Sequence, residues 1–220
     1  MALVGSGVLG VWHGVAPGME RMFDDWYNAE HHAERIGIDG FLRGRRYINL
    51  RHGRRYFCRY DVEDVSVLAS PAYLAALNNP TERSRRKLPH FRSTLRGAYR
   101  VTKRHGWADG GYAVVCRFGQ AGDDGADPGP AIEEFTAHVL DKPAVTAVEY
   151  WEVEPEVTNI ASEEKFLRKA LDIFPARVLV IDGSDPDAME AAIEAAPHRH
   201  ALDGAEMDFC KLVYHAAKRA

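Results

Sequence analysis

The stretch FLRGRRYINLRHGRRYFCRYDVE, residues 41–63, predicts two antiparallel strands joined by a tight connection. Residues 41–50 and 56–63 contain aromatic and β-branched side chains, which favour strands. The connection between them, RHGR at residues 51–54, is short and contains a glycine, as expected for a hairpin. This hairpin is the centre from which the rest of the fold is predicted.

The hairpin is flanked on both sides by a helix and then by a strand. Upstream, apolar residues recur at helical spacing over residues 19–36, and a strand is predicted at 8–15. Downstream, a helix is predicted at 65–77, another begins near Asn79, and a strand follows at 95–103. This order of elements is the ferredoxin-like motif, an antiparallel sheet with its helices on one face.

The same order occurs again in the second half of the chain. Strands are predicted at 112–118, 145–153, 177–182 and 206–215, and helices at 131–140, 185–196 and, as an extra element, around 163–171. The uncovered face of each sheet has to be buried, and the other sheet is the nearest partner. We predict an α+β fold of tandem ferredoxin-like βαββαβ repeats, residues 1–108 and 109–220, packed as a pseudo-dimeric α/β barrel within one chain. The first repeat is expected to carry the pocket, and the second to be degenerate.

The composition is that of a globular protein, and its charge is divided unevenly. Hydrophobic residues make up 46% of the chain, and no apolar run approaches the ~20 residues that cross a bilayer. Residues 1–110 contain 18 Lys and Arg against 11 Asp and Glu, whereas residues 111–220 contain 10 against 21. Because the basic residues lie in predicted strands and helices, we expect either that the halves attract each other or that the arginines form internal pairs. We expect no nucleic-acid partner.

The cysteines and the first residues of the chain indicate where the protein resides. Cys58, Cys116 and Cys210 are far apart in the sequence, lack metal-type spacing, and fall within predicted strands. The first residues lack the basic start and long apolar stretch of a signal peptide. We therefore expect free thiols, a cytoplasmic location and no membrane association.

Ionisable and aromatic side chains are concentrated at residues 26–35 of the first predicted helix. At about 100° per residue, Glu30 falls on the apolar face, His31 at its edge, and His32 and Arg35 outside it. A carboxylate beside an imidazole can perform acid–base chemistry, because the pKa values of both groups can be tuned towards neutrality. The alternative is structural: Glu30 forms an ion pair with an arginine of the neighbouring sheet, and His31 is half solvated.

No cofactor or metal site is predicted. Glu30, His31 and His32 are consecutive, so they cannot converge on one ion from a helix. The sequence GSGVLG, residues 5–10, matches the dinucleotide pattern G-x-G-x-x-G, but a predicted strand follows it where the pattern requires a helix.

Several motifs of the first half resemble those of the dimeric α/β-barrel superfamily. They are WYNAEHHAER at residues 26–35, GFLRGRRY at 40–47, LASPAYL at 68–74 and NPT at 79–81. The superfamily includes EthD-like proteins, muconolactone-isomerase-like enzymes and antibiotic-biosynthesis-type monooxygenases, and the last two motifs resemble those of uncharacterised bacterial members. The resemblance covers most of residues 8–103, whereas over residues 111–220 it extends only to the order of elements.

The resemblance implies a small hydrophobic ligand between sheet and helices, in many members without a cofactor. A histidine after a tryptophan on the first helix is a recurrent site residue of the superfamily, and His31 holds that position here. We expect the protein to bind a small hydrophobic or aromatic carbonyl or lactone metabolite and to perform cofactor-independent acid–base or monooxygenase-type chemistry on it. His31 is expected to act as the acid–base, with Glu30 as its partner. The residues expected to line the substrate site are Trp12, Trp26, Tyr27, Arg45 and Tyr47.

Three alternatives to this enzyme hypothesis remain open. The first is a non-catalytic ligand-binding or structural protein, the second is haem binding, which occurs in branches of the superfamily, and the third is nucleic-acid binding through the basic half. A homodimer is expected if either sheet keeps a free edge, and a monomer is expected if the two sheets pair internally.

Overall fold

The computed structural model describes residues 5–51, 53–120, 129–169 and 173–218. The strands of the first half are β1 (Gly7–Val15), β2 (Phe41–Asn49), β3 (Tyr56–Val62) and β4 (Phe91–Gly106). Its helices are α1 (Glu20–Trp26), α2 (His32–Ile36), α3 (Pro71–Asn78) and α4 (Glu82–Lys87). A π-helical turn, η1 (Tyr27–His31), joins α1 to α2, and two 3-10 turns are η2 (Val65–Ala69) and η3 (Leu88–His90).

The second half follows the same order, with two additional short helices. Its strands are β5 (Tyr112–Gln120), β6 (Val145–Val153), β7 (Pro175–Gly183) and β8 (Glu206–Ala217). Its helices are α5 (Gly129–Leu140), α6 (Pro155–Thr158), α7 (Glu163–Arg168) and α8 (Pro186–Glu194), and η4 (Arg199–Leu202) is a 3-10 turn.

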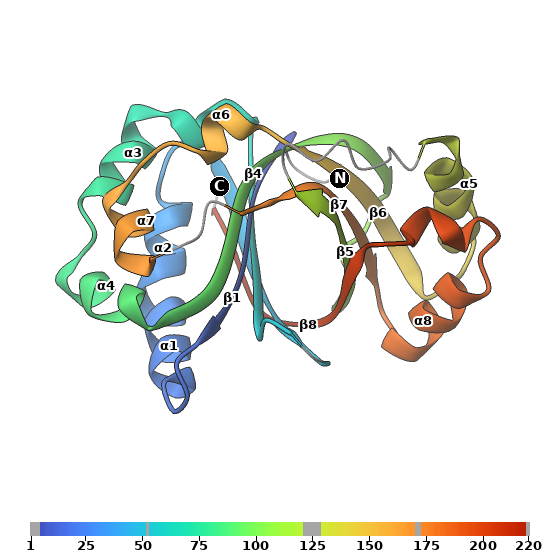
Figure 1. Cartoon of the computed structure of the whole chain (residues 1–220), viewed down its shortest axis with the longest axis horizontal. Helices are drawn as coiled ribbons and strands as arrows, with labels where there is room; N and C mark the ends of the chain where they lie inside the picture. The colour runs from blue at the N-terminus through green and yellow to red at the C-terminus, as the bar shows by residue number, and fades with distance from the viewer. Residues whose placement is uncertain (1–4, 52, 121–128, 170–172, 219–220) are drawn as a thin grey trace.

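The eight strands form one closed antiparallel barrel in the order β1-β3-β2-β8-β5-β7-β6-β4. Helices α1 to α4 lie on one side of the barrel, and α5 and α8 lie on the other (Figure 1). The predicted α+β class and the pseudo-dimeric α/β barrel within one chain are confirmed. The division into domains at residues 108 and 109 stays a prediction.

The barrel closes because strands of the two halves pair edge to edge. β2 pairs with β8, and β4 pairs with β6. β4 extends beyond the predicted residues 95–103 because it pairs with β1 over Phe91 to Arg100 and with β6 over Tyr99 to Gly106. A partner strand that is distant in sequence is not visible in the local pattern, so the predicted boundaries were too narrow.

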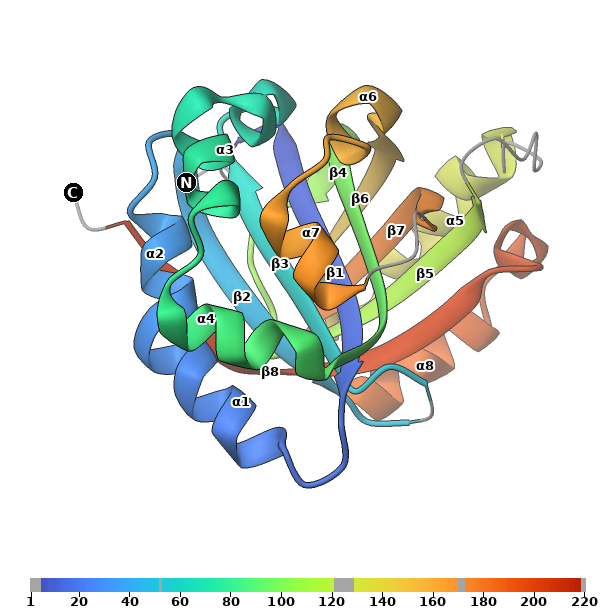
Figure 2. The same ribbon diagram turned by 60° about the vertical axis from the view of Figure 1, so that its left-hand side comes forward.

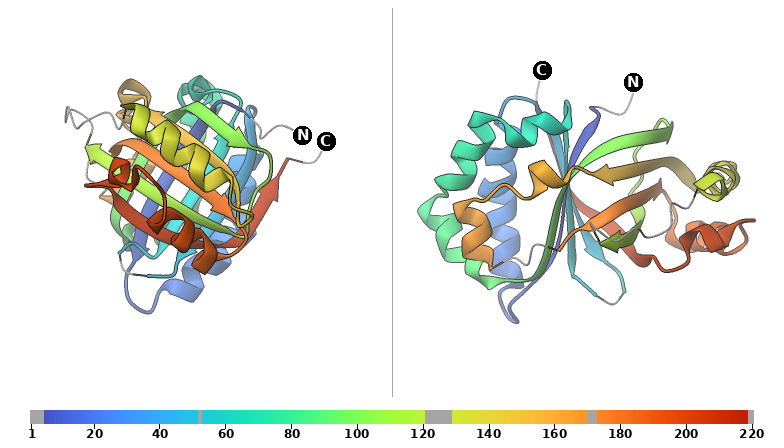
Figure 3. Two further views of the ribbon diagram at one scale, coloured as in Figure 1. Left: turned by 90° about the vertical axis from the view of Figure 1, so that its right-hand side faces the viewer. Right: turned by 45° about the horizontal axis from the view of Figure 1, so that its top comes forward.

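Alternate residues along each strand face either the barrel interior or a layer of helices. The interior contains a layer of buried aromatic rings, namely Trp12, Tyr47, Phe57, Tyr99 and Trp151. The helices of each half cover a separate apolar core on the outer face of the barrel (Figure 3). The first half therefore buries side chains on both faces of its strands.

An ionic network fills one end of the barrel interior and joins the two halves. Asp61 accepts hydrogen bonds from Arg43, Arg45 and Arg59, and Arg59 also donates to Glu149 of the second half at 2.8 Å. Burial raises the pKa of the Asp61 carboxyl, but these guanidinium groups outweigh burial and hold that pKa below its usual range. Both expected kinds of pairing therefore occur: the arginines pair with Asp61 within the first half, and Arg59 pairs with Glu149 of the second half.

A segment of the second half crosses to the helix layer of the first. α7 lies beside α3 (Figure 2) and packs against α3, η3 and β4, whereas α6 packs against β4 and η2. α7 thereby brings side chains of the second half to the outer face of the first-half strands.

Within the described ranges, no helix is long and apolar enough to cross a membrane. The same residues contain no group of three or more His, Cys, Asp or Glu side chains that could hold a metal ion. All three cysteines are buried and free.

Candidate functional site

The helix that carries the candidate residues contains the π-helical turn Tyr27–His31. A π turn holds more residues than an α turn, so the side chains in it and after it point in directions different from those of a regular helix. His31, His32 and Arg35 are all buried, with exposed fractions of 5%, 0% and 3%. The prediction that His32 and Arg35 point outward was therefore wrong.

His32 occupies space that a glycine on the neighbouring strand leaves free. A Cβ atom at Gly44 would lie 2.8 Å from Nδ1 of His32. The ring of His32 packs against Tyr27 and Tyr214, with centroids 4.7 Å apart in each case. Burial, followed by the charges of His31 and Arg46, lowers the pKa of His32 to about 2. His32 is thus a neutral packing residue at pH 7.

Glu30 does not face the apolar core. Its carboxylate accepts a hydrogen bond from Thr81 Oγ1 at 2.6 Å and one from Arg83 Nη1 at 3.3 Å. These contacts lie at the start of α4 and leave the Glu30 side chain 21% exposed. The predicted inward carboxylate was wrong, and so was the alternative that pairs Glu30 with a sheet arginine, because the π turn moves Glu30 towards α4.

His31 lies between aromatic rings of its own helix and a group of charged side chains. Its ring centroid is 4.6 Å from that of Trp26 and 4.8 Å from that of Tyr27. Burial, followed by the charge of Arg35, lowers the pKa of His31 from 6.5 to about 3. Its Nδ1 has no hydrogen-bond partner, and Glu34 Oε2 lies 3.7 Å from it. At pH 7 the imidazole is neutral, so one ring nitrogen can accept a proton.

The charged groups beside His31 come from α2 and α7. Glu164 accepts a hydrogen bond from Arg35 and another from Arg168 Nη1, at 3.4 Å. The Arg168 side chain is 6% exposed, and its Nε and Nη2 have no hydrogen-bond partner. His31, Arg35, Glu164 and Arg168, with Tyr27, Tyr60 and Tyr73, form what we name the His31 cluster. These residues border a space of only about 10 Å³.

The residues predicted to line one substrate site lie on two faces of the sheet. Trp26 and Tyr27 belong to the helix-covered core, on the same side as His31. Trp12 and Tyr47 face the barrel interior, and Arg45 points into the Asp61 network. The prediction of a single wall was wrong, because alternate residues of a strand point to opposite faces.

The sequence pattern does not identify three residues that lie in this region of the structure. Glu164 and Arg168 lie four positions apart on one face of α7, but the local sequence does not indicate which part of the protein α7 packs against. His13 was read only as part of a strand. Its ring is buried among aromatic side chains, with centroids 4.4 Å from Phe91 and 4.8 Å from Phe23.

Acid is expected to destabilise the protein through His13, His31 and His32. Burial lowers the folded-state pKa of His13 and His31 to about 3 and that of His32 to about 2, below the unfolded value of 6.5. Their contribution to stability is therefore complete above pH 6.5 and is lost as the pH falls towards 3. Each histidine should add about 1.4 kcal/mol per pH unit to the slope of the unfolding free energy.

Urea unfolding between pH 7 and pH 4 measures this slope. His13→Phe keeps an aromatic ring in place and should reduce the slope by about 1.4 kcal/mol per pH unit, the contribution of one histidine. His105→Gln alters a histidine that is 46% exposed and should leave the slope unchanged. An unchanged slope in His13→Phe would contradict the assignment of a neutral, buried His13.

Comparisons with known proteins support the fold alone. No family model matches the chain, and no curated protein matches it. The structure is similar to that of an anthrone oxidase-like protein, with a TM-score of 0.64 and 12% sequence identity. The similarity covers 96% of this chain and 92% of the chain of that protein. A proposed monooxygenase from Fusobacterium nucleatum has a similar structure, with a TM-score of 0.57 and 11% sequence identity. The similarity covers 98% of this chain and 96% of that one. A heme-binding protein from Thermus thermophilus has a TM-score of 0.50 and 10% identity, covering 96% and 92%.

These similarities, together with the barrel topology, identify the dimeric α/β-barrel fold. The predicted resemblance to that superfamily is therefore confirmed at the level of fold, whereas the EthD-like assignment stays a prediction.

The residues around His31 do not fit a haem group as they are placed. Cofactor sites typically have volumes of about 300–1,000 Å³, whereas the space beside His31 is about 10 Å³. The rings of Trp26 and Tyr27 pack on the imidazole, and Glu164 and Arg168 border the same space.

Proposed function

We propose that the protein binds a small aromatic carbonyl compound at the His31 cluster and removes a proton next to the carbonyl group, as the first step of a monooxygenase-type reaction. The observation that carries the proposal is a set of buried polar atoms without partners, His31 Nδ1 and Arg168 Nε and Nη2, whose side chains border one space. Leaving such an atom unpaired costs about 1–3 kcal/mol, and native cores mostly avoid that cost. The free N–H groups of Arg168 would donate hydrogen bonds to the carbonyl oxygen of the bound ligand.

The chemistry follows from the charges of the cluster. Neutral His31 takes the proton, and the guanidinium of Arg168 stabilises the negative charge that develops on the substrate oxygen. Burial and the charge of Arg35 lower the pKa of His31 and so disfavour the imidazolium that forms, and Glu164 offsets part of this effect, since its charge acts to raise that pKa. With dioxygen as the oxidant, a CH2 group becomes a carbonyl: one oxygen atom enters the product, and the other leaves as water with the two hydrogens. The similarity to an anthrone oxidase-like protein supports a ligand of this class.

Access to the cluster requires movement, since a space of about 10 Å³ holds at most one water molecule. We infer that α7 shifts when the ligand enters, because Glu164 and Arg168 are the parts of the cluster that belong to the second half. The same tight filling favours a second candidate, a protein in which the cluster only ties α7 to the first half and catalyses nothing.

Anthrone, used as a probe, distinguishes these candidates. We expect the protein to accelerate anthrone oxidation, followed by oxygen uptake and by the absorbance of the product. His31→Phe removes the base but keeps a buried ring, and it should reduce the rate by about 10²–10⁴-fold. Glu30→Gln serves as a matched control on the same helix and should retain the rate, because Glu30 contacts Thr81 and Arg83.

The outcomes separate the hypotheses. Binding of anthrone without turnover in the wild-type protein supports a non-catalytic binder. Unchanged turnover in the His31→Phe variant would contradict the acid–base role of His31. The absence of both binding and turnover in the wild-type protein would support the candidate in which the cluster has only a structural role. Circular dichroism of each variant checks that the fold is retained.

Location and assembly remain proposals. Three buried free thiols support the predicted cytoplasmic location. A homodimer would have to use helices or loops, because each described strand already has two neighbours in the closed barrel. Sedimentation velocity measures the assembly directly.

A further inference from the structure

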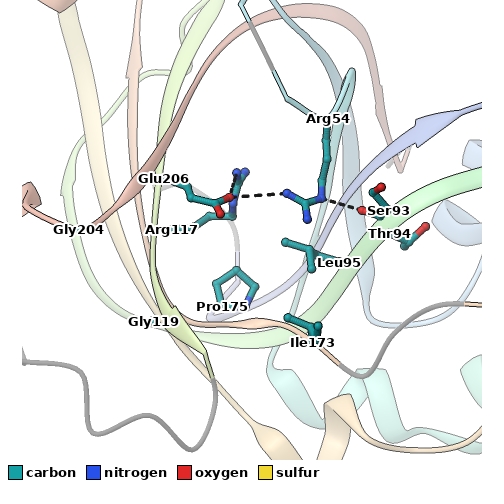
Figure 4. A pocket seen from close by; sticks show the side chains of 10 residues that line it. All are labelled: Arg54, Ser93, Thr94, Leu95, Arg117, Gly119, Ile173, Pro175, Gly204 and Glu206. Atoms are coloured by element: carbon teal, nitrogen blue, oxygen red, sulfur yellow. Dashed lines mark hydrogen bonds and ion pairs between the residues drawn. The ribbon is translucent and has the colours of Figure 1, made fainter.

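A separate cavity of about 460 Å³ lies at the other end of the barrel from the Asp61 network. β3 begins beside this cavity, near Arg54, and ends in the network at Asp61. Its lining includes the apolar side chains of Leu95, Ile173 and Pro175 and the charged side chains of Arg54, Arg117 and Glu206 (Figure 4). Its volume falls within the range of about 300–1,000 Å³ that is typical of small-molecule sites.

Two guanidinium groups converge on one carboxylate oxygen in this cavity. Glu206 Oε2 lies 2.9 Å from Arg117 Nη2 and 3.6 Å from Arg54 Nη1. The Glu206 side chain is 69% exposed, whereas those of Arg117 and Arg54 are 5% and 24% exposed. An exposed carboxylate gains little from such pairs, so another carboxylate can replace it at small cost.

Both arginines are held in place by groups other than Glu206. Arg117 donates to Asp208, and its guanidinium lies 5.5 Å from the ring centroid of Trp12. Arg54 Nε donates to the backbone carbonyl of Ser93 at 2.6 Å. The Nε of Arg117 is buried and has no hydrogen-bond partner. The two guanidinium groups are therefore already positioned when Glu206 turns to solvent.

We propose that this cavity binds a small organic carboxylate. The carboxylate of the ligand replaces that of Glu206 between Arg54 and Arg117, and its apolar body lies against Leu95 and the other apolar walls. Planar, charged guanidinium groups bind carboxylates with strong, directional hydrogen bonds, which a neutral ligand cannot form equally. This site is on the interior face of the barrel and does not depend on the function proposed for the His31 cluster.

Isothermal titration calorimetry with benzoate, and with benzamide as its neutral isostere, tests the proposal. We expect the wild-type protein to bind benzoate at least about tenfold more tightly than benzamide, since charge-assisted hydrogen bonds contribute more than neutral ones. Glu206→Gln removes the competing carboxylate and should tighten benzoate binding several-fold. Arg54→Gln should weaken it about tenfold or more, and Arg117→Gln should weaken it at least as much.

Three control variants test whether the effects are specific to this cavity. Arg100 and Glu154 form an ion pair on the outer surface, so Arg100→Gln and Glu154→Gln should leave benzoate binding unchanged. His31→Phe should also leave it unchanged, which separates this site from the His31 cluster. Arg54 is partly exposed, so Arg54→Gln remains informative if Arg117→Gln fails to fold.

Three outcomes would overturn the proposal. One is no benzoate binding by either the wild-type protein or Glu206→Gln up to about 10 mM, a limit that corresponds to less than about 3 kcal/mol of binding free energy. The second is equal affinity for benzoate and benzamide. The third is unchanged affinity in a folded Arg54→Gln variant.

Discussion

Replacing Asp61 with asparagine is expected to lower the free energy of unfolding by about 3–5 kcal/mol at pH 7. Asp61 is fully buried and accepts hydrogen bonds from Arg43, Arg45 and Arg59. Asparagine keeps the shape of the side chain but removes its negative charge, so three buried guanidinium groups lose a shared counterion. Urea unfolding followed by far-ultraviolet circular dichroism measures the difference.

A surface aspartate provides the matched control for this substitution. Asp39 is fully exposed and pairs with Lys218, so Asp39→Asn should leave the unfolding midpoint unchanged. The folded-state pKa of Asp61 lies below the unfolded value of 3.8, so its contribution is complete above that value and is lost only as the pH falls below it. The deficit of Asp61→Asn should therefore stay constant from about pH 8 to pH 5. A loss of less than about 1 kcal/mol would mean that the network does not need this carboxylate.

Replacing Trp12 with alanine should cost about 3–5 kcal/mol of stability. Trp12 is fully buried in the barrel interior, where its ring stacks on Phe57 at 5.0 Å and meets the edge of Tyr99 at 6.2 Å. Alanine leaves a cavity that surrounding strands cannot close, because the hydrogen bonds of the barrel fix their spacing. Trp107→Ala is the matched control, since Trp107 is 82% exposed and its loss should change stability little.

The Trp12 variant also tests on which face of the sheet the residue acts. Trp12 belongs to the interior core and Trp26 to the helix-covered core. Where Trp12→Ala is still folded, we expect ligand binding at the His31 cluster to be unchanged. If the variant kept its stability but lost binding at that cluster, Trp12 would be part of the His31 site after all.

The order of helices and strands was predictable because it depends on local patterns. Apolar residues at helical spacing placed the helix at residues 19–36, which became α1, η1 and α2. Aromatic and β-branched residues on either side of a glycine-containing connection placed the hairpin at residues 41–63, which became β2 and β3. The repeated order of elements was enough to predict a barrel within one chain. The longer extent of β4 was not predictable, because its last residues pair with a strand of the other half.

The candidate site was predicted in part. His31, Trp26 and Tyr27 are buried together, as their positions on one helix suggested. The direction of Glu30 was not predictable, because a regular helical wheel contains no π turn. The arginine and the glutamate that complete the cluster come from α7, about 130 residues further along the chain.

The sequence by itself determined the order of the main helices and strands, the barrel class and the helix that holds His31, since periodicity and turn residues act over a few positions. Only the tertiary structure decided which face of the sheet each predicted residue occupies, where α7 docks, and that Arg54 and Arg117 meet at one end of the barrel. Those relations arise from strand pairing and packing between distant segments, and the local order of residues does not encode them individually.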